Sequence, residues 1–535
     1  MTKDSYSFEK LPFSKLFKTY TKDFSKLQEF YPYNPFDENS IASKVTSITK
    51  TDAHNGYIKA LDTYHSDLGI SQVNQLQKLG KEDSLAIVTG QQLGIYGGPV
   101  FTIYKTITTI LLAKQWEKKL GKPVVPVFWL ADEDHDFDEV AWFGISANED
   151  FKKIVYDEVS TGGLVSDYSI SESIHPFKSE IKELFIDTDF STDLWKLYDE
   201  CFTVGDTFAS AFAKMMDSMF GKHGLLIAGS NTREIKTIVA QTFSDSITKH
   251  HQIHEALDVQ SKHLASEYHS QVVLGDTNLF YLDEKRRRVK IERSQNSWKA
   301  GDKEWNEEDL TAEISSVPEK FSPNVFLRPI IQDQLLPTLG YVAGPGETAY
   351  YGQMKALYSI FGLEMPVIFP RLSATLLESG IERIMEKLPF ELNKYSERIE
   401  DLDSEYVTLS ESHDIEALFN NWKQEIKAIS DNPSEIIRDI DASLDGTVGK
   451  TISGFDTALD NLKGKVYRSV KQQEHTQLQR IRKIKAQLYP GGGLQERMVS
   501  FMYFMNKYGI NVWDEVLELF EDESLDLFHH YIIKL

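Results

Sequence analysis

The segment SLAIVTGQQLGIYGGPVFTIYKTITTILLAKQWEKKLGKPVVPVFWLADEDHDFDE, residues 84–139, decides the predicted fold of this chain. An apolar run at 85–88 enters a glycine-rich turn, and a helical pattern then runs from Pro99, which suits the first helical position, to Gly121. A second apolar run at 124–130 ends in an acidic cluster at 132–136. Strand, glycine turn, helix and strand in this order are typical of open α/β sheets, which bind ligands at the carboxyl ends of their strands. The segment therefore predicts a small-molecule site.

The composition limits the class of protein. A chain of 535 residues suggests two or three domains, and a net charge of −23 argues against a nucleic-acid partner, which would need a basic face. The one cysteine, Cys201, excludes an internal disulfide and a multi-cysteine metal site, so no zinc is expected. No apolar run reaches about 18 residues and the first residues lack a signal-peptide pattern, so we expect a cytoplasmic protein with no membrane partner.

Three more apolar runs of strand length are followed by helical patterns, at 225–228, 335–342 and 367–369. Alternating strands and helices predict a parallel sheet covered by helices on both faces, so we predict a Rossmann-like α/β core over residues 1–375. Insertions at about 145–220 and 232–270 are expected to be lobes built onto this core. A hairpin is expected at 278–293, and its basic run KRRRVK is interpreted as exposed.

Residues 376–488 are predicted to form a helical coiled-coil domain, because apolar residues recur there every three or four positions. The Asp-Asn-Pro sequence at 431–433 is expected to break the chain, and one long helix would then run from Ser434 to Leu488. An isolated two-helix arm buries little surface, so two arrangements stay open: a homodimer through the coiled coil and an intramolecular helical bundle. Residues 489–535 carry a further helical pattern and are expected to return to the core.

The glycine-rich turn after the first strand offers backbone groups to a ligand. Its glycines let the main chain approach a ligand closely, and the next helix is expected to present free N–H groups to an anion. A lysine in the first turns of that helix would reach a phosphate or a carboxylate. The candidate substrate-binding residues here are Gln91, Gln92, Gly94, Gly97, Gly98 and Lys105. The alternative is a tight loop without a ligand.

Four carboxylates and one imidazole follow the second strand at 132–136. Like charges this close raise one another's pKa, a cost that often marks a functional site. Three roles stay open: coordination of a divalent metal such as Mg²⁺, general-base catalysis, and binding of a ligand amine. A hydrated acidic loop is the structural alternative.

A third combination of strand, glycine turn and helix lies at 338–350, and it places Glu347 at a helix N-terminus. Two arginines, one before and one after this segment, are expected to reach the same crevice and to hold a carboxylate-bearing substrate. The candidate substrate-binding residues of this region are Asn324, Arg328, Gly344, Gly346, Glu347 and Arg371. Three glycines before a later helix are a second candidate cradle for the phosphates of a nucleotide: Gly491, Gly492 and Gly493.

Five long motifs resemble, in the same order and over nearly the whole chain, the cysteine-adding enzymes of bacillithiol biosynthesis. They are TGQQLGIYGGPVFTIYKTI, PVFWLADEDHDFDEV, SPNVFLRPIIQDQLLPTLGYVAGPGETAYY, the coiled-coil stretch and LYPGGGLQERMVSFMYFMNKYG. The resemblance implies a cytoplasmic ligase that adds L-cysteine to the amino group of glucosaminyl-malate in the last step of bacillithiol biosynthesis. It also implies a Rossmann core with connecting-peptide insertions, similar to class I aminoacyl-tRNA synthetases, and a homodimer formed through the coiled coil. By analogy with other cysteine ligases it implies activation of cysteine by ATP and Mg²⁺, although the sequence contains neither a HIGH-type nor a KMSKS-type motif.

The candidate residues fit an amide-forming reaction between these small molecules. The loop at 91–99 would bind anionic groups of the substrate or a nucleotide. Asp134 and His135 are the candidate catalytic residues, because they would bind or deprotonate the attacking amine. Arg328 or Arg371 would hold the malate carboxylates. Two other functions remain as alternatives: a metal-dependent hydrolase that uses the cluster at 132–136, and a non-catalytic coiled-coil scaffold.

Overall fold

The computed structural model describes residues 1–147, 149–294, 297–410, 414–521 and 525–535. Contacts divide the chain into two compact units. The first unit, which we call the Rossmann-like unit, comprises residues 1–145, 152–376 and 495–535. The second, the helical unit, comprises residues 146–151 and 377–494. No helix among the described residues is both long enough and apolar enough to cross a membrane.

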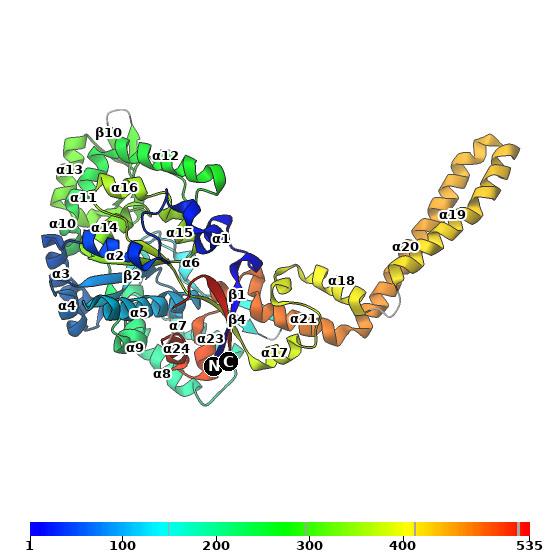
Figure 1. Ribbon diagram of the computed structural model, residues 1–535, viewed down its shortest axis with the longest axis horizontal. Coiled ribbons are helices and arrows are strands. Elements are labelled where there is room, and N and C mark those ends of the chain that lie inside the picture. Colours follow the sequence, from blue (N-terminus) through cyan, green and yellow to red (C-terminus); the bar gives the residue numbers. More distant parts are fainter. Residues whose placement is uncertain (148, 295–296, 411–413, 522–524) are drawn as a thin grey trace. The chain divides into compact units, whose positions relative to one another are not determined.

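A five-stranded parallel sheet forms the centre of the Rossmann-like unit, as predicted (Figure 1). Its strands are β2 (Leu85–Gln91), β3 (Val124–Leu130), β6 (Leu226–Ala228), β13 (Thr338–Ala343) and β14 (Val367–Pro370). They are the five apolar runs of the sequence. All residues of β3, β6, β13 and β14 are buried, because helices cover a parallel sheet on both faces.

The strand order is β14-β13-β2-β3-β6. Numbered along the chain within this sheet, the order is 3-2-1-4-5 when read from β6, which is the order of the Rossmann fold. The chain reverses its direction of winding between β2 and β13. A crevice therefore opens at the carboxyl ends of these two neighbouring strands, where ligands of such sheets bind.

Helix α5 (Phe101–Leu120) connects β2 to β3, and Gly121 ends it in the left-handed conformation with φ 63°, as predicted. The helix begins two residues later than predicted, because Pro99 pairs with Ser500 in an isolated β-bridge instead of taking the first helical position. The amide of Val100 donates to the carbonyl oxygen of Val499 over 2.9 Å. The C-terminal segment of the chain is thereby fixed to the start of α5.

The remaining elements of the Rossmann-like unit surround this sheet. Between β3 and β6 lie α6 (Phe137–Val140), the hairpin of β4 (Trp142–Ala147) and β5 (Asp150–Val155), α7 (Ile174–Leu184), α8 (Ser191–Cys201) and α9 (Phe208–Phe220). Residues 146–151 of the hairpin belong to the helical unit. Between β6 and β13 lie α10 (Arg233–Ile238), α11 (Ala240–Thr248), α12 (His250–Glu267), β7 (Leu279–Leu282), β8 (Arg288–Lys290), β12 (Phe321–Pro323) and α14 (Leu327–Leu335). Strands β7 and β8 pair antiparallel and form the predicted hairpin. After β14, β15 (Ser373–Leu377) joins β16 (His529–Lys534) and β1 (Thr2–Ser7) in a separate sheet.

The helical unit contains the predicted coiled coil. Helices α19 (Ile415–Ile440) and α20 (Asp445–Gln473) pack side by side around Phe419 and Leu459 (Figure 1). Two ion pairs connect them, Lys423 to Asp460 at 2.7 Å and Lys463 to Glu416 at 2.6 Å. The other principal helices of this unit are α17 (Ser379–Met385), α18 (Ile399–Ser410) and α21 (His475–Leu488).

The position of the break in the coiled coil was predicted wrongly. Helix α19 continues through Pro433, and the chain turns only at residues 441–444. A proline inside a helix removes one backbone donor, but exposed backbone carbonyls can be hydrated, so the helix continues here at a cost. Asp441 ends the helix instead, because its backbone is extended (φ −155°) and its carboxylate accepts a hydrogen bond from the amide of Ser443. The single helix predicted from 434 to 488 therefore consists of three segments: the end of α19, α20 and α21.

Candidate active site

A cavity of about 490 Å³ opens at the carboxyl ends of the parallel strands, and all the residues that line it belong to the Rossmann-like unit. The ends of β2, β3, β13 and β14 each contribute to its wall, and Ser230 contributes from the loop after β6. Every strand of the sheet thus leads into the same space, as expected at the point where the winding reverses. Most of the predicted residues line it: Gln91, Gln92, Lys105, Asn324, Arg328, Asp134, Gly344, Gly346, Glu347 and Arg371.

Lys105 and Glu347 form a buried ion pair in the cavity wall, with 2.5 Å between Nζ and Oε2. The lysine also donates to the carbonyl oxygen of Gly90 over 2.7 Å. Glu347 is the third residue of α15 (Pro345–Tyr351) and accepts from the amide of Gly344 and the hydroxyl of Tyr341, both over 2.7 Å. Burial raises the pKa of Glu347, but Lys105 and these donors outweigh it and keep the pKa below its ordinary value. The carboxylate is therefore ionised. It connects α15 to β13 through Tyr341 and to α5 through Lys105, at the point where the winding of the sheet reverses.

Three arginines bring uncompensated positive charge to the cavity. Among the residues that the structure describes, Arg288, Arg328 and Arg497 form no ion pair with a carboxylate, although all three line the cavity. Burial lowers the pKa of Arg328, but the neighbouring Tyr350 and Tyr341 and the more distant carboxylates outweigh it and keep the guanidinium protonated. In an acidic chain, unpaired arginines that converge on one cavity indicate an anionic ligand.

Asp134 points to the cavity and His135 does not line it. The Asp134 carboxylate accepts from Gln92 Nε2 over 2.8 Å and from the amide of His135 over 2.7 Å. Burial raises the pKa of Asp134, but the hydrogen bonds from His135 and Gln92 and the charge of Arg328 outweigh it and hold the pKa well below its usual range. Asp134 is therefore a permanent carboxylate, suited to binding a cation or a donor and unsuited to accepting a proton near neutral pH.

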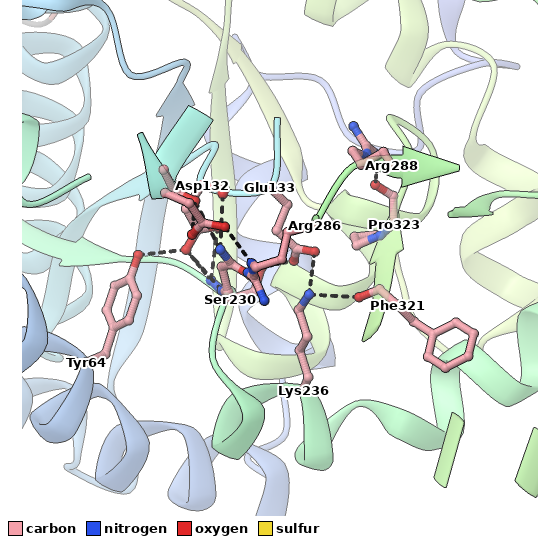
Figure 2. Close-up of polar contacts among 12 residues, drawn as sticks. Tyr64, Asp132, Glu133, Ser230, Lys236, Arg286, Arg288, Phe321 and Pro323 are labelled. Carbon is pink, nitrogen blue, oxygen red and sulfur yellow. Dashed lines mark hydrogen bonds and ion pairs between the residues drawn. The ribbon is translucent and has the colours of Figure 1, made fainter. Parts of the chain in front are cut away.

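The first two members of the acidic cluster, Asp132 and Glu133, line the cavity and are held by hydrogen bonds and an ion pair (Figure 2). Asp132 accepts from the hydroxyl of Tyr64 over 2.7 Å and from the amide of Ser230 over 3.1 Å. Glu133 accepts from the hydroxyl of Ser230 over 2.7 Å and pairs with Lys236 over 2.8 Å. No group of three or more His, Cys, Asp or Glu side chains in the described part of the chain is arranged to hold a metal ion.

Asp132 is expected to make stability depend on pH. Burial, followed by the charge of Glu133, raises the pKa of Asp132 to about 7. The folded-state pKa of Asp132 lies above its unfolded value. The contribution of Asp132 to the unfolding free energy is therefore fully present below about pH 4, and it is lost as the pH rises through about 7. The unfolding free energy of the wild type minus that of Asp132→Asn should therefore decrease between pH 4.5 and 8. Denaturant unfolding at a series of pH values measures this difference, and a constant or rising difference would contradict the assignment.

The glycine turn after β2 uses several of its amides for hydrogen bonds within the turn itself. Gly97 and Gly98 have φ 87° and 77°, and a Cβ atom at Gly97 would lie 2.3 Å from the ring of Phe501. The amides of Gly97, Gly98 and Thr102 donate to backbone carbonyls of the same turn. Gly94, Gly97 and Gly98 do not line the cavity, and the turn requires them for its backbone conformation and close packing. Gly491, Gly492 and Gly493 belong to the helical unit, where the nucleotide cradle stays a prediction.

Sequence reasoning missed two of the cationic residues. Arg288 lies in the run KRRRVK, which we interpreted as exposed, yet its guanidinium enters the cavity, stacks 4.0 Å from the centroid of the Phe280 ring and donates to the carbonyl oxygen of Pro323 over 2.6 Å. Strand alternation in β8 was the signal that could have found it. Arg497 comes from the C-terminal segment, more than a hundred residues beyond the last strand of the sheet, and its position has no local signal.

Comparisons with known proteins agree with this architecture. The family described as "Bacillithiol biosynthesis BshC, N-terminal Rossmann-like domain" matches residues 1–372, and the family described as "Bacillithiol biosynthesis BshC, C-terminal coiled-coil domain" matches residues 374–535. The chain belongs to the BshC family of bacillithiol biosynthesis. The resemblance of the five sequence motifs is thereby confirmed.

Similar BshC proteins span nearly the same length as this chain. One from Salinibacter ruber, named "Putative cysteine ligase BshC", is 30% identical over 94% of this chain and 94% of its own length. One of the same name from Chloroherpeton thalassium is 30% identical and covers 98% of this chain and 97% of its own length. A solved structure described as "putative arginyl t-RNA synthetase" from Campylobacter jejuni has a TM-score of 0.25 and 10% identity over 88% of this chain and 99% of its own. This similarity is too low to support an inference about fold or function.

Proposed function

We propose that this chain is a ligase that forms an amide between the carboxyl group of L-cysteine and the amino group of glucosaminyl-malate, in the last step of bacillithiol biosynthesis. Membership of the BshC family and the printed name of the relatives support the reaction class. The observation that carries the proposal is the set of unpaired arginines at the switch point of the sheet, because the malate moiety would bring two carboxylates.

Arg328 and Arg288 are the proposed binding residues for the malate carboxylates. Arg328 lies in the first turn of α14 and Arg288 at the start of β8, so two elements of different direction present guanidinium groups to one space. Each guanidinium offers several N–H donors in a plane, which matches the two oxygens of a carboxylate. Arg371 is less suited than the sequence suggested, because Glu496 already occupies both of its terminal nitrogens.

Asp134 is the proposed binding residue for the amino sugar. Its permanently ionised carboxylate would accept hydrogen bonds from the amine or from sugar hydroxyls, and Gln92 fixes its orientation. A carboxylate with so low a pKa positions the amine and does not deprotonate it. His135 stays a candidate without contact to the cavity: its side chain is 48% exposed and its Nδ1 lies 3.4 Å from the guanidinium of Arg288.

Activation of the cysteine carboxyl group requires a leaving group, and we propose ATP with Mg²⁺ as its source. Transfer of a phosphoryl or adenylyl group from ATP to the carboxylate would form a mixed anhydride and release ADP or pyrophosphate. The amine would then displace phosphate or AMP, either of which leaves more readily than an oxide ion. The amides of Gly97, Gly98 and Thr102 are occupied, so the residues that fit a phosphate are the other cations of the cavity, among them Lys105 and Arg497. These side chains would hold the anion and neutralise its charge while the amine approaches.

Mass spectrometry of the purified protein tests the proposal. The protein is incubated with glucosaminyl-malate and L-cysteine, with and without ATP and Mg²⁺. We expect a product whose mass equals the sum of the two substrates minus one water, formed only in the presence of the nucleotide. A product without nucleotide would refute the activation chemistry alone, and the absence of product in all samples, with both substrates shown to be intact, would refute the ligase.

We also propose that the chain forms a homodimer through α19 and α20. Exposed apolar side chains follow one another at helical spacing on α19, and two of them, Ile429 and Ile440, are 74% and 77% exposed. Ile436 lies between them on the same face, next to the face that packs against α20. An apolar stripe of this length on a two-helix arm is typical of a surface covered by a second copy.

Replacing Ile436 and Ile440 together with glutamate is expected to convert the dimer into a monomer, because a charge cannot be buried unpaired at such an interface. Light scattering after size-exclusion chromatography measures the mass of each species. Lys427→Glu is the matched control, since it adds negative charge to an exposed position on the opposite side of α19. A monomeric wild type, or a double variant that stays dimeric, would show that this stripe is not the interface.

A further inference from the structure

Arg371 and Arg497 bring further cationic groups to the cavity, separate from Arg288 and Arg328. Arg371 follows β14, and its side chain is 1% exposed. Its two terminal nitrogens bind the carboxylate of Glu496, with NH1 at 3.0 Å from Oε2 and NH2 at 2.5 Å from Oε1. The Nε–H is the one donor of this guanidinium group that is buried and has no hydrogen-bond partner among the described residues. A buried donor without a partner is costly, so its retention calls for an acceptor.

The Nε–H of Arg371 borders the cavity beside Gly344. A Cβ atom at Gly344 would lie 3.7 Å from Arg371 Nε and 3.3 Å from Glu347 Oε2. Both Gly344 and Arg371 line the cavity. The glycine therefore keeps open the space in front of the unpaired donor, a space that any side chain at this position would begin to fill.

Arg497 approaches the same place from the C-terminal segment. Its guanidinium carbon lies 5.7 Å from the centre of the Phe101 ring, and that of Arg371 lies 5.6 Å from the centre of the same ring. Glu496 compensates the charge of Arg371, whereas Arg497 forms no ion pair with a carboxylate in the described part of the chain. Arg497 therefore brings to this part of the cavity a positive charge that no ion pair neutralises, and a bound anion would neutralise it.

Glu496 fixes the orientation of Arg371. Besides the arginine, its Oε2 accepts from the hydroxyl of Ser373 over 2.9 Å and from the amide of Ala374 over 3.2 Å. Ser373 is in turn bonded to His530 of β16 over 2.8 Å. The carboxylate is buried and held by four donors, so it leaves the guanidinium only one orientation, with Nε toward Gly344.

We propose that the Nε–H of Arg371 and the guanidinium of Arg497 form a binding site for one oxyanion, a carboxylate or a phosphate, and that Glu496 is a positioning residue for this site. This deepens the proposed function and rests on it for the identity of the ligand. Three sources of the oxyanion fit: the malate moiety, the carboxylate of L-cysteine and a phosphate of the nucleotide. All three share the chemistry that the two arginines recognise.

Titration calorimetry of the full chain tests the site without turnover. Glucosaminyl-malate, L-cysteine and Mg-ATP are titrated singly into the wild type, Arg497→Ala, Arg497→Lys and Glu496→Gln, and L-malate and pyrophosphate serve as simple oxyanion probes. Loss of a charge-assisted contact is expected to weaken the one ligand whose oxyanion occupies the site by roughly 10- to 100-fold in Arg497→Ala. The lysine variant should recover part of this loss, and Glu496→Gln should weaken the same ligand. Arg233→Ala, a substitution at an exposed arginine outside the cavity, is the matched control.

The ligand that responds identifies the source of the oxyanion. Unchanged affinities for all ligands and probes in Arg497→Ala would overturn the site, and so would an equal loss for all of them, which would indicate only the general field of the cavity. A wild type that binds no oxyanion would overturn it as well. Circular dichroism of each variant identifies any loss of folding. If Arg497→Ala does not fold, the ligand affinities of Arg497→Lys decide whether the site exists. If no product forms but Arg497→Ala loses affinity for one probe, the ligase fails and the oxyanion site stands.

Discussion

Replacing Arg328 with alanine is expected to lower kcat/KM for glucosaminyl-malate by about 100- to 10,000-fold, since two charge-assisted hydrogen bonds of about 1.5–3 kcal/mol each would be lost. Arg328 is protonated, lies within the field of Asp134 and Glu347, and has no carboxylate of its own among the described residues. The loss should appear mainly in KM for glucosaminyl-malate, because a carboxylate remote from the new amide is bound equally in the ground state and the transition state. Steady-state kinetics with each substrate varied in turn measures the effect.

Arg328→Lys is the conservative variant for this experiment. It keeps the charge and loses the planar pair of donors, so we expect an intermediate kcat/KM. Arg233→Ala, at an exposed position outside the cavity, controls for a nonspecific loss of positive charge. Wild-type kinetics for Arg328→Ala, or a loss confined to KM for L-cysteine, would show that Arg328 does not hold the malate moiety.

Local patterns predicted the sheet because each strand carries its own signal. The five strands of the parallel sheet coincide with the five apolar runs, since a strand buried on both faces requires an almost continuous apolar sequence. That the carboxyl ends of those strands lie at one edge of the sheet follows from the parallel topology alone. Asp134, Glu347 and Lys105 could therefore be assigned to one crevice before the distances between them were known.

Other parts of the site depend on contacts that no local pattern encodes. Arg497 reaches the cavity only because Val499 and Ser500 pair with the start of α5, about four hundred residues earlier in the chain. The glycines of the first turn illustrate the opposite error. Gly97 and Gly98 are required by positive φ and by the ring of Phe501, so a glycine-rich turn after a strand does not by itself indicate a phosphate.

The acidic cluster shows why spacing in sequence does not determine chemistry. Asp132, Glu133 and Asp134 are consecutive, but they lie at a turn after β3 and their carboxylates meet different sets of partners. Asp132 is hydrogen-bonded to Tyr64, Glu133 is paired with Lys236, and Asp134 has an ionised carboxylate near the unpaired Arg328. The structure therefore supports binding at Asp134 and a supporting role for the other two.

The pair of Glu133 and Lys236 is expected to be the most costly to break. Their side chains are 8% and 1% exposed, and Lys236 also donates to the carbonyl oxygen of Phe321 over 2.7 Å (Figure 2). Replacing Glu133 with alanine leaves a buried ammonium group without its counter-ion, which is expected to lower the unfolding free energy by about 3–5 kcal/mol. Lys236→Met should cost a similar amount, because it leaves the carboxylate unpaired. Chemical denaturation, with circular dichroism as the probe, measures both.

The double variant separates the ion pair from the packing around it. Because neither charge remains, Glu133→Ala with Lys236→Met should be more stable than the sum of the two single losses predicts, by roughly 1–3 kcal/mol of coupling energy. Lys114→Met, at an ion pair of the surface in which both partners are about 40% exposed, is the matched control and should change stability by less than about 1 kcal/mol. Additive losses in the double variant would mean that the two side chains act independently. Glu133 also lines the cavity. If the pair is coupled, one ion pair therefore both stabilises the fold and holds part of the cavity wall in place.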